Sequence, residues 1–208
     1  MIMMRGMMKR ASLLAVALSA SLFGADVRPL PEVPRTGGLP LMEALSRRQS
    51  QRDFTEGATL TEAELAGVLW AANGFNRDGK RTAPSAMNAQ AVDIYVFDAT
   101  GAWRYEPAAS RLTLVRAGDL RGETGGQPFV RKAAVNLVFV YDTARAPRKG
   151  DSRWAAVDAA FCAENVYLYC ASAGLKTVVR GSVSQEQVAK ALGLPETARA
   201  VLAQSVGK

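Results

Sequence analysis

The stretch from Arg153 to Ala173 constrains the fold most, because it has the length of a helix and is apolar nearly all round. Its large side chains are Trp154, Val157, Phe161, Val166, Tyr167, Leu168 and Tyr169. A helix with no polar face must be covered on every side, either by its own sheet or by a second subunit. We favour the second subunit as the cover and therefore expect a homodimer.

A second apolar stretch, from Val135 to Tyr141, is rich in strand-forming residues and predicts a strand buried on both faces. Three shorter runs before it have spacings that suit hairpins, and two further runs follow it. These runs are Val92–Phe97, Ala102–Tyr105, Arg111–Val115, Leu175–Val179 and Ala198–Val206. The pattern predicts an α+β fold in which helices flank an antiparallel sheet.

Helix starts are marked by capping boxes at Thr61 with Glu64 and at Ser184 with Gln187. The first predicts a helix that ends near Gly74, and the second predicts a helix that ends at Leu192. A short helix is also expected from residue 41. Between these elements, residues 76–85 are predicted to form a polar loop, with Ser85 capping a short turn through residue 88.

The N-terminus has the anatomy of a secretory signal in residues 1–25, where three basic residues precede an apolar run from residue 11 to residue 24. The run has 14 residues, fewer than the roughly 20 that a membrane-spanning helix needs. We therefore expect cleavage near residue 24 or 25 and a periplasmic location. An uncleaved membrane anchor is the alternative.

The leader is followed by residues 26–40, whose four prolines and two glycines predict an extended arm on the surface or on a neighbouring molecule. Residues 41–208 then suit one domain, since a hydrophobic content of 49% for the whole chain is ordinary for a globular core.

Charge and residue types exclude several functions. Of the net charge of +7, three positive charges lie in the leader, which leaves 7 − 3 = +4 for the rest. This excess is mild, and no basic stripe is interleaved with aromatic residues, so we expect no nucleic-acid partner. The absence of histidine from the sequence excludes His-based triads and histidine metal sites, and we expect no metal.

The two cysteines, Cys162 and Cys170, lie in one predicted helix. Their separation corresponds to an axial rise of roughly 12 Å, whereas a disulfide needs Cα atoms within about 7 Å. We therefore expect buried thiols rather than an internal disulfide.

A basic cluster follows the short helix: Arg47-Arg48-Gln49-Ser50-Gln51-Arg52-Asp53-Phe54 places three guanidinium groups and a serine hydroxyl within six residues. Guanidinium groups match phosphate oxygens in bidentate geometry, and the hydroxyl supplies a further donor. A solvated surface cluster is the plainer alternative. We interpret the cluster as an anion site, because other stretches of the chain fit the same ligand.

Four stretches carry a family resemblance. They are Arg48-x-Ser50-x-Arg52-x-Phe54; Pro84-Ser85-Ala86-Met87-Asn88-Ala89-Gln90; the apolar helix ending Ser172-Ala173-Gly174-Leu175; and Val179-Arg180-Gly181 followed by Leu192-Gly193-Leu194-Pro195. In this order they resemble the FMN-dependent nitroreductase superfamily, from Leu41 to the C-terminus. The stretches 81–86 and 103–107 look most like the subgroup that includes azoline-oxidising dehydrogenases of peptide maturation, whereas Asn88 and Gln90 match ordinary nitroreductases.

The resemblance implies FMN as the cofactor and assigns Arg48 and Ser50 to its phosphate, with Gln49 between them in the binding set. Lys208 would add positive charge from the far side. Arg52 would lie near the ribityl chain and the N1 and C2 carbonyl edge of the flavin, where its charge stabilises the anionic reduced ring.

The same resemblance implies two further sets of residues that would contact the flavin. Asn88 would bond the pyrimidine edge, while Pro84, Ser85 and Ala86 would lie against the ring or the phosphate. After Val179, the backbone N–H of Arg180 or Gly181 would face N5 and the O4 carbonyl, and a glycine there allows close approach of the backbone.

The implied activity is two-electron transfer through flavin N5 to a small organic acceptor, at two sites shared between subunits. Because soluble nicotinamide cofactors are scarce in the periplasm, we expect a membrane or periplasmic redox partner as the electron donor. Two alternatives stay open. One is an azoline-type dehydrogenase that oxidises a peptide thiazoline or oxazoline, and the other is a flavin-binding scaffold without turnover.

Overall fold

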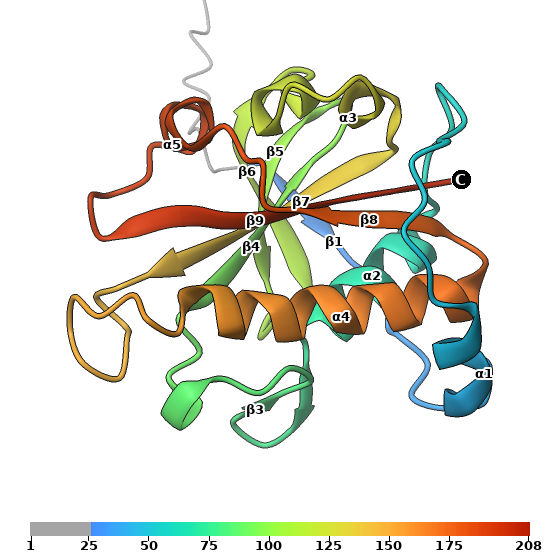
Figure 1. The fold of residues 1–208 in the computed structure, drawn as a ribbon, viewed down its shortest axis with the longest axis horizontal. Coiled ribbons are helices and arrows are strands. Elements are labelled where there is room, and N and C mark those ends of the chain that lie inside the picture. Colours follow the sequence, from blue (N-terminus) through green and yellow to red (C-terminus); the bar gives the residue numbers. More distant parts are fainter. Residues whose placement is uncertain (1–25) are drawn as a thin grey trace, which may run out of the picture.

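The computed structural model describes residues 26–208, and the expected leader lies outside these residues. Seven strands form one antiparallel sheet in the order β1-β6-β5-β4-β7-β9-β8 (Figure 1). They are β1 (Val27–Pro29), β4 (Val92–Phe97), β5 (Gly101–Glu106), β6 (Arg111–Ala117), β7 (Val135–Asp142), β8 (Lys176–Arg180) and β9 (Ala198–Gly207). A separate two-stranded hairpin pairs β2 (Phe75–Arg77) with β3 (Lys80–Arg81).

Helices cover both faces of the sheet, with α2 and α4 on one side and α3 and α5 on the other (Figure 1). The α-helices are α1 (Leu41–Arg47), α2 (Glu62–Asn73), α3 (Phe129–Lys132), α4 (Ala155–Ala173) and α5 (Gln185–Leu192), and the 3-10 helices are η1 (Ala86–Asn88) and η2 (Arg121–Thr124). The predicted α+β class with a flanked antiparallel sheet is therefore confirmed.

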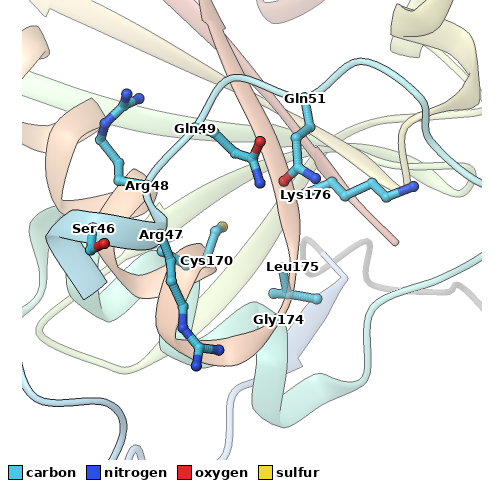
Figure 2. A pocket seen from close by; sticks show the side chains of 10 residues that line it. Ser46, Arg47, Arg48, Gln49, Gln51, Cys170, Gly174, Leu175 and Lys176 are labelled. Carbon is cyan, nitrogen blue, oxygen red and sulfur yellow. The ribbon is translucent and has the colours of Figure 1, made fainter. Parts of the chain in front are cut away.

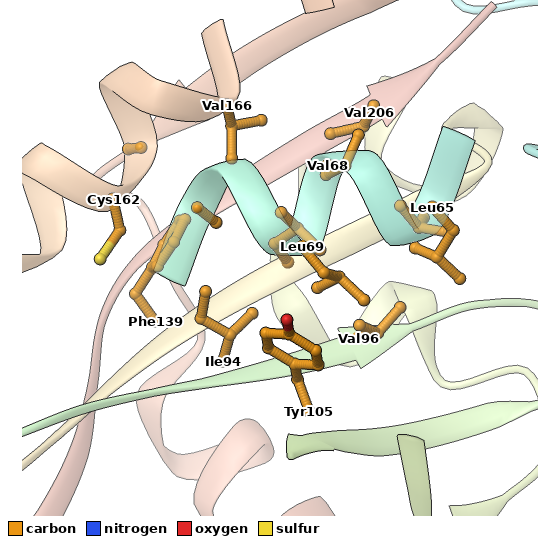
Figure 3. Packing of buried hydrophobic residues seen from close by; sticks show 14 of the residues in the cluster. Leu65, Val68, Leu69, Ile94, Val96, Tyr105, Phe139, Cys162, Val166 and Val206 are labelled. Atoms are coloured by element: carbon orange, nitrogen blue, oxygen red, sulfur yellow. The ribbon is translucent and has the colours of Figure 1, made fainter. Parts of the chain in front are cut away.

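Strand β7 forms the middle of the hydrophobic core. Its Leu137 and Phe139 belong to the apolar cluster shared with α2 and α4, whereas Val138 and Val140 belong to a second cluster shared with α5. Phe139 lies opposite Ile94 of β4, in the layer between the sheet and the two helices (Figure 3). The prediction of a strand buried on both faces is confirmed.

Helix α2 begins with the predicted capping box. The Glu64 N–H donates to Thr61 Oγ1 at 3.2 Å, and the Thr61 N–H donates to Glu64 Oε2 at 2.7 Å. Helix α5 lacks such a box, because no side-chain bond caps it and Ser184 has φ −75° and ψ 81°, outside the extended region that an N-cap residue adopts. The second predicted capping box is therefore wrong.

We expect Thr61→Ala to lower the free energy of unfolding by about 1 kcal/mol, because it leaves an N–H group of α2 without its acceptor. The matched control is Ser184→Ala, whose effect should stay within about 0.5 kcal/mol since this side chain caps nothing. Urea unfolding curves with unchanged slopes would measure both variants. Equal losses would contradict the different roles of the two side chains.

Two segments expected to lack regular structure contain strands. In the predicted loop 76–85, β2 and β3 pair around Gly79, whose φ of +59° suits a tight turn. In the arm, β1 pairs with β6 at the edge of the sheet, and Arg28 bonds the carboxylates of Glu62 and Asp98. The first residues of the arm, Val27–Pro29, are therefore an edge strand of this sheet.

Within residues 26–208, part of the surface of helix α4 is left uncovered. It packs on α2 and on the sheet, but Trp154, Val157 and Phe161 remain 40%, 42% and 46% exposed. On the neighbouring α1, Leu41 and Met42 are also exposed. Among residues 26–208, no helix combines the length and the apolarity needed to cross a lipid bilayer.

Candidate active site

The basic cluster runs beside the edge strand β8. The Gln51 N–H donates to the Thr177 carbonyl at 2.9 Å, and the Thr55 N–H donates to the Lys208 carbonyl at 2.7 Å. These bonds fix the stretch that follows α1 along the outer edge of the sheet. Residues from the front and the end of the chain thus share one edge.

Tyr167 of α4 joins the two stretches through its hydroxyl group. This hydroxyl accepts the Val179 N–H at 2.9 Å and lies 2.7 Å from Ser50 Oγ. When Tyr167 gives its own proton to Ser50, the serine hydroxyl keeps its proton for an outside acceptor. The arrangement can therefore present a hydroxyl donor to an anion.

The three arginines of the cluster do not converge. Arg47 pairs with Glu43 inside α1, and its side chain extends in a different direction from that of Arg48 (Figure 2). The Arg48 guanidinium lies 5.2 Å from the centre of the Tyr167 ring, and that of Arg52 lies 6.0 Å from the centre of the Phe129 ring. Within residues 26–208, neither Arg48 nor Arg52 forms an ion pair with a carboxylate.

A cavity of about 420 Å³ opens beside this cluster, between the end of α1, the C-terminal end of α4 and the start of β8 (Figure 2). Arg48, Gln49 and Lys176 are among its lining residues. The Lys176 ammonium bonds the Asp53 carboxylate at 2.9 Å, and this bond lowers the pKa of Asp53. Cationic and amide groups therefore dominate the polar lining.

The outer edge of β8, which is not paired with another strand among residues 26–208, lies beside the cluster. The Thr177 carbonyl and the Val179 N–H both point outward from the sheet. Alternate residues of a strand present their backbone groups to the same edge, so Gly181 continues this edge. A Cβ atom at Gly181 would meet no atom of the described residues within 4 Å, which leaves room for a ligand to approach the backbone.

The stretch with Pro84, Ser85, Ala86 and Asn88 lies elsewhere in the protomer. The Ala86 N–H donates to Asp158 Oδ1 at 3.0 Å, near the N-terminal end of α4. Asp158 and Tyr167 are 167 − 158 = 9 residues apart on this helix, which corresponds to roughly 13 Å along its axis. One protomer therefore does not bring this stretch to the β8 edge.

The backbone of this loop is strained. Met87, Asn88 and Gln90 have φ values of 52°, 55° and 51°, a region that residues other than glycine seldom adopt. The loop is held by the Gln90 N–H, which donates to Ser85 Oγ at 3.0 Å, so Ser85 closes the loop instead of capping a turn. Strain of this kind gathers at ligand sites.

Lys208 lies at the C-terminal end of β9, where its ammonium group pairs with Glu64 Oε2 at 3.1 Å. Its positive charge is therefore paired with an acidic residue in the first turn of α2. The Arg180 side chain turns into the protein rather than toward the β8 edge, and it bonds Thr124 and Asn136.

Three residues with roles at these sites were missed from the sequence. Tyr167 looked like core packing in an apolar helix, and its hydroxyl gave no signal. Lys176 stands alone in a strand, and Asp158 is a single acid near the start of α4. Asp158 is only 2% exposed, and burial raises the pKa of its carboxyl group.

Residues 26–208 contain no cluster of three or more His, Cys, Asp or Glu side chains that could hold a metal ion. Cys162 and Cys170 are buried free thiols. Burial raises the pKa of Cys162 to about 12 and raises that of Cys170 as well. Neither thiol has the exposure or the depressed pKa of a reactive cysteine.

The fold and this edge site define an α+β protein with a cationic, phosphate-compatible groove beside an edge strand. A model of the nitroreductase family matches residues 45–208, and the chain belongs to this family. It is therefore a nitroreductase-family oxidoreductase.

Individual relatives agree with this assignment. A crystal structure from Ralstonia eutropha, provisionally named a nitroreductase, is 44% identical, has a TM-score of 0.81 and covers 88% of this chain and 89% of its own. A Methanocaldococcus jannaschii protein with a similarly provisional name is 27% identical over 79% of this chain and 90% of its own. A microcin synthetase complex from Escherichia coli, solved with a truncated pro-microcin bound, shares the fold at 17% identity, with a TM-score of 0.66 over 96% of this chain and 84% of its own.

Proposed function

We propose that this protein is an FMN-dependent oxidoreductase that transfers two electrons to a small organic acceptor, and that it works as an exported homodimer. The observation that carries the proposal is the Tyr167 hydroxyl, which links Ser50 of the basic cluster to Val179 of β8. It supports one ligand that contacts both the cluster and the β8 edge.

The chemistry of these residues fits FMN. The Arg48 guanidinium, which has no ion-pair partner within residues 26–208, and the Ser50 hydroxyl would bind the phosphate group. The open backbone at Gly181 would let the amide of this edge approach the ring closely. Arg52 would hold positive charge toward the ring. When bound, FMN supplies two-electron transfer.

A second subunit would complete the site. The strained loop with Ser85, Ala86 and Asn88 is separated from Tyr167 by roughly 13 Å of helix within one chain, so its proposed ring contacts need another protomer. The uncovered face of α4, with Val157 and Phe161, supports pairing through that helix. An apolar face of this kind is typical of a dimer interface.

We expect the purified protein to show flavin absorption bands and Arg48→Gln to bind FMN about 10- to 100-fold more weakly. A charge-assisted hydrogen bond contributes about 1.5–3 kcal/mol, and 1.4 kcal/mol is a factor of ten. Arg47→Gln is the matched control, because Arg47 pairs with Glu43, and its affinity should change less than threefold. Fluorescence titration of the flavin-free proteins with FMN measures both.

A colourless protein that does not bind added FMN would refute the proposed cofactor. Equal weakening by Arg47→Gln and Arg48→Gln would mean that the cluster attracts the anion only through its net charge. The proposed donor, a membrane or periplasmic redox partner, is tested by steady-state assays of the FMN-loaded protein. Rapid turnover with NADH or NADPH would contradict it.

An azoline-type dehydrogenase is the second candidate, and the fold shared with the microcin synthetase complex favours it. In that case a peptide thiazoline or oxazoline would reduce the bound FMN. Mixing the FMN-loaded protein with such a peptide under anaerobic conditions, and following loss of the flavin absorption, separates the two candidates. A flavin-binding scaffold would show no reduction by any substrate and no turnover with added acceptors.

A further inference from the structure

Arg180, the last residue of β8, carries a buried guanidinium group. The residue is only 5% exposed. Its Nη1 donates to the carbonyls of Thr124 and Ser182 at 2.9 and 3.2 Å, and its Nη2 donates to Thr124 Oγ1 and Asn136 Oδ1 at 2.9 and 3.2 Å. The group therefore has a fixed position under the end of the strand.

All four acceptors are neutral. Within residues 26–208 no carboxylate pairs with Arg180, and its buried Nε atom has no hydrogen-bond partner. Burial lowers the pKa of Arg180 to about 10, so the side chain is still a cation at neutral pH. A buried charge without a counter-charge is costly to a fold, and hydrogen bonding alone could be provided by a neutral side chain.

The surrounding backbone is adapted to this cation. A Cβ atom at Gly125 would lie 2.3 Å from Arg180 Nη1 and would displace the guanidinium group from this position. The next residue after Arg180 is Gly181, at the open end of the β8 edge. Because Nη1 bonds the carbonyl of Ser182, the residue after Gly181, the charge lies close to the backbone proposed to approach the flavin ring.

We propose that Arg180 is an electrostatic positioning residue, whose buried charge favours the reduced, anionic form of FMN at the β8 edge over the oxidised form. This inference rests on the proposed function. Reduction by two electrons and one proton leaves one additional negative charge on the ring. In a medium of lower dielectric constant than water, a cation held nearby attracts that charge more strongly.

The test compares the affinities of Arg180→Gln and the wild type for oxidised FMN and for FMN reduced with dithionite under anaerobic conditions. We expect the variant to bind the oxidised form within about threefold of the wild type and the reduced form at least tenfold more weakly. For a two-electron couple, a tenfold difference corresponds to a potential about 30 mV lower, which redox titration of the bound flavin measures directly. Arg180→Lys keeps the charge and should stay within about threefold for both forms.

Asn136→Asp is a second variant that tests the same proposal if Arg180→Gln does not fold. It places a carboxylate where Asn136 Oδ1 already accepts a bond from Arg180 at 3.2 Å, so it neutralises the cation in place. We expect the same selective loss of at least tenfold for reduced FMN. The control is Arg111→Gln in β6, five strands away in the sheet and so about 24 Å distant, which should change neither affinity.

If Arg180→Gln and Asn136→Asp weaken the binding of oxidised and reduced FMN equally, Arg180 only stabilises the local structure. That result would overturn the inference. No change in either form would overturn it too. A wild-type protein that binds neither form would instead refute the proposed function on which the inference rests. The two failures are therefore distinct.

Discussion

Replacing Phe139 by alanine is expected to lower the free energy of unfolding by about 3–5 kcal/mol. The ring is completely buried, and β7 holds it between β4 and β9 in the layer under α2 and α4. Loss of the ring removes apolar contacts and leaves a cavity that the neighbouring strands cannot close. Because whole domains are stable by only about 5–15 kcal/mol, much of the protein's stability would be lost.

Urea unfolding followed by far-ultraviolet circular dichroism measures this effect, and Phe139→Leu is the control. Leucine fills most of the space, so the control should lose only about 1–1.5 kcal/mol. If alanine were tolerated as well as leucine, β7 would not form the middle of the core. Such a result would also contradict the assignment of both helices to one packed layer.

The sheet was predictable because its strands have strong local patterns. The run from Val135 to Tyr141 around Phe139 is apolar apart from Asn136, which indicates burial on both faces. Helix α2 was predictable because Thr61 and Glu64 bond each other within one turn, so sequence spacing alone determines the contact. Local interactions of this kind can be inferred without knowledge of the rest of the fold.

Other features depend on partners distant in the chain. The arm forms a strand only because β6 offers it an open edge and because Arg28 finds Glu62 and Asp98. Ser184 has the sequence pattern of a cap, but the chain enters α5 with a backbone angle that prevents the cap. Spacing alone could reveal neither the arm's partners nor this entry angle.

In the candidate site too, some features could be predicted from the local sequence and others depend on residues distant in the chain. The basic cluster could be interpreted as an anion site from residue types, since guanidinium groups suit phosphate oxygens, whereas the glycine after β8 was implied only by the family resemblance. Tyr167 could not be found, because its role arises from 2.7 Å and 2.9 Å contacts to Ser50 and Val179, residues remote in sequence. The buried charge of Arg180, which no carboxylate pairs with in the part of the chain that the structure describes, was equally hidden, since burial is a property of the fold.

Val157→Glu is expected to convert the proposed homodimer into monomers and to weaken FMN binding at least tenfold. Val157 is 42% exposed, so the substitution removes little packing from the protomer itself. In a dimer that pairs through α4, however, the new carboxylate would be buried in an apolar interface without a partner. The loop around Ser85 would then be lost from the neighbouring site, and flavin affinity should fall together with association.

Light scattering after size exclusion, combined with FMN titration of the same samples, measures both effects. Val115→Glu in β6 is the matched control, since Val115 is 38% exposed on a different element, and it should leave both properties unchanged. Variants of Val157 that are monomeric but bind FMN fully would mean that one protomer forms the whole site. Because Asp158 and Tyr167 hold the two halves of the site roughly 13 Å apart along α4, association and cofactor binding should instead be lost over the same range of protein concentration.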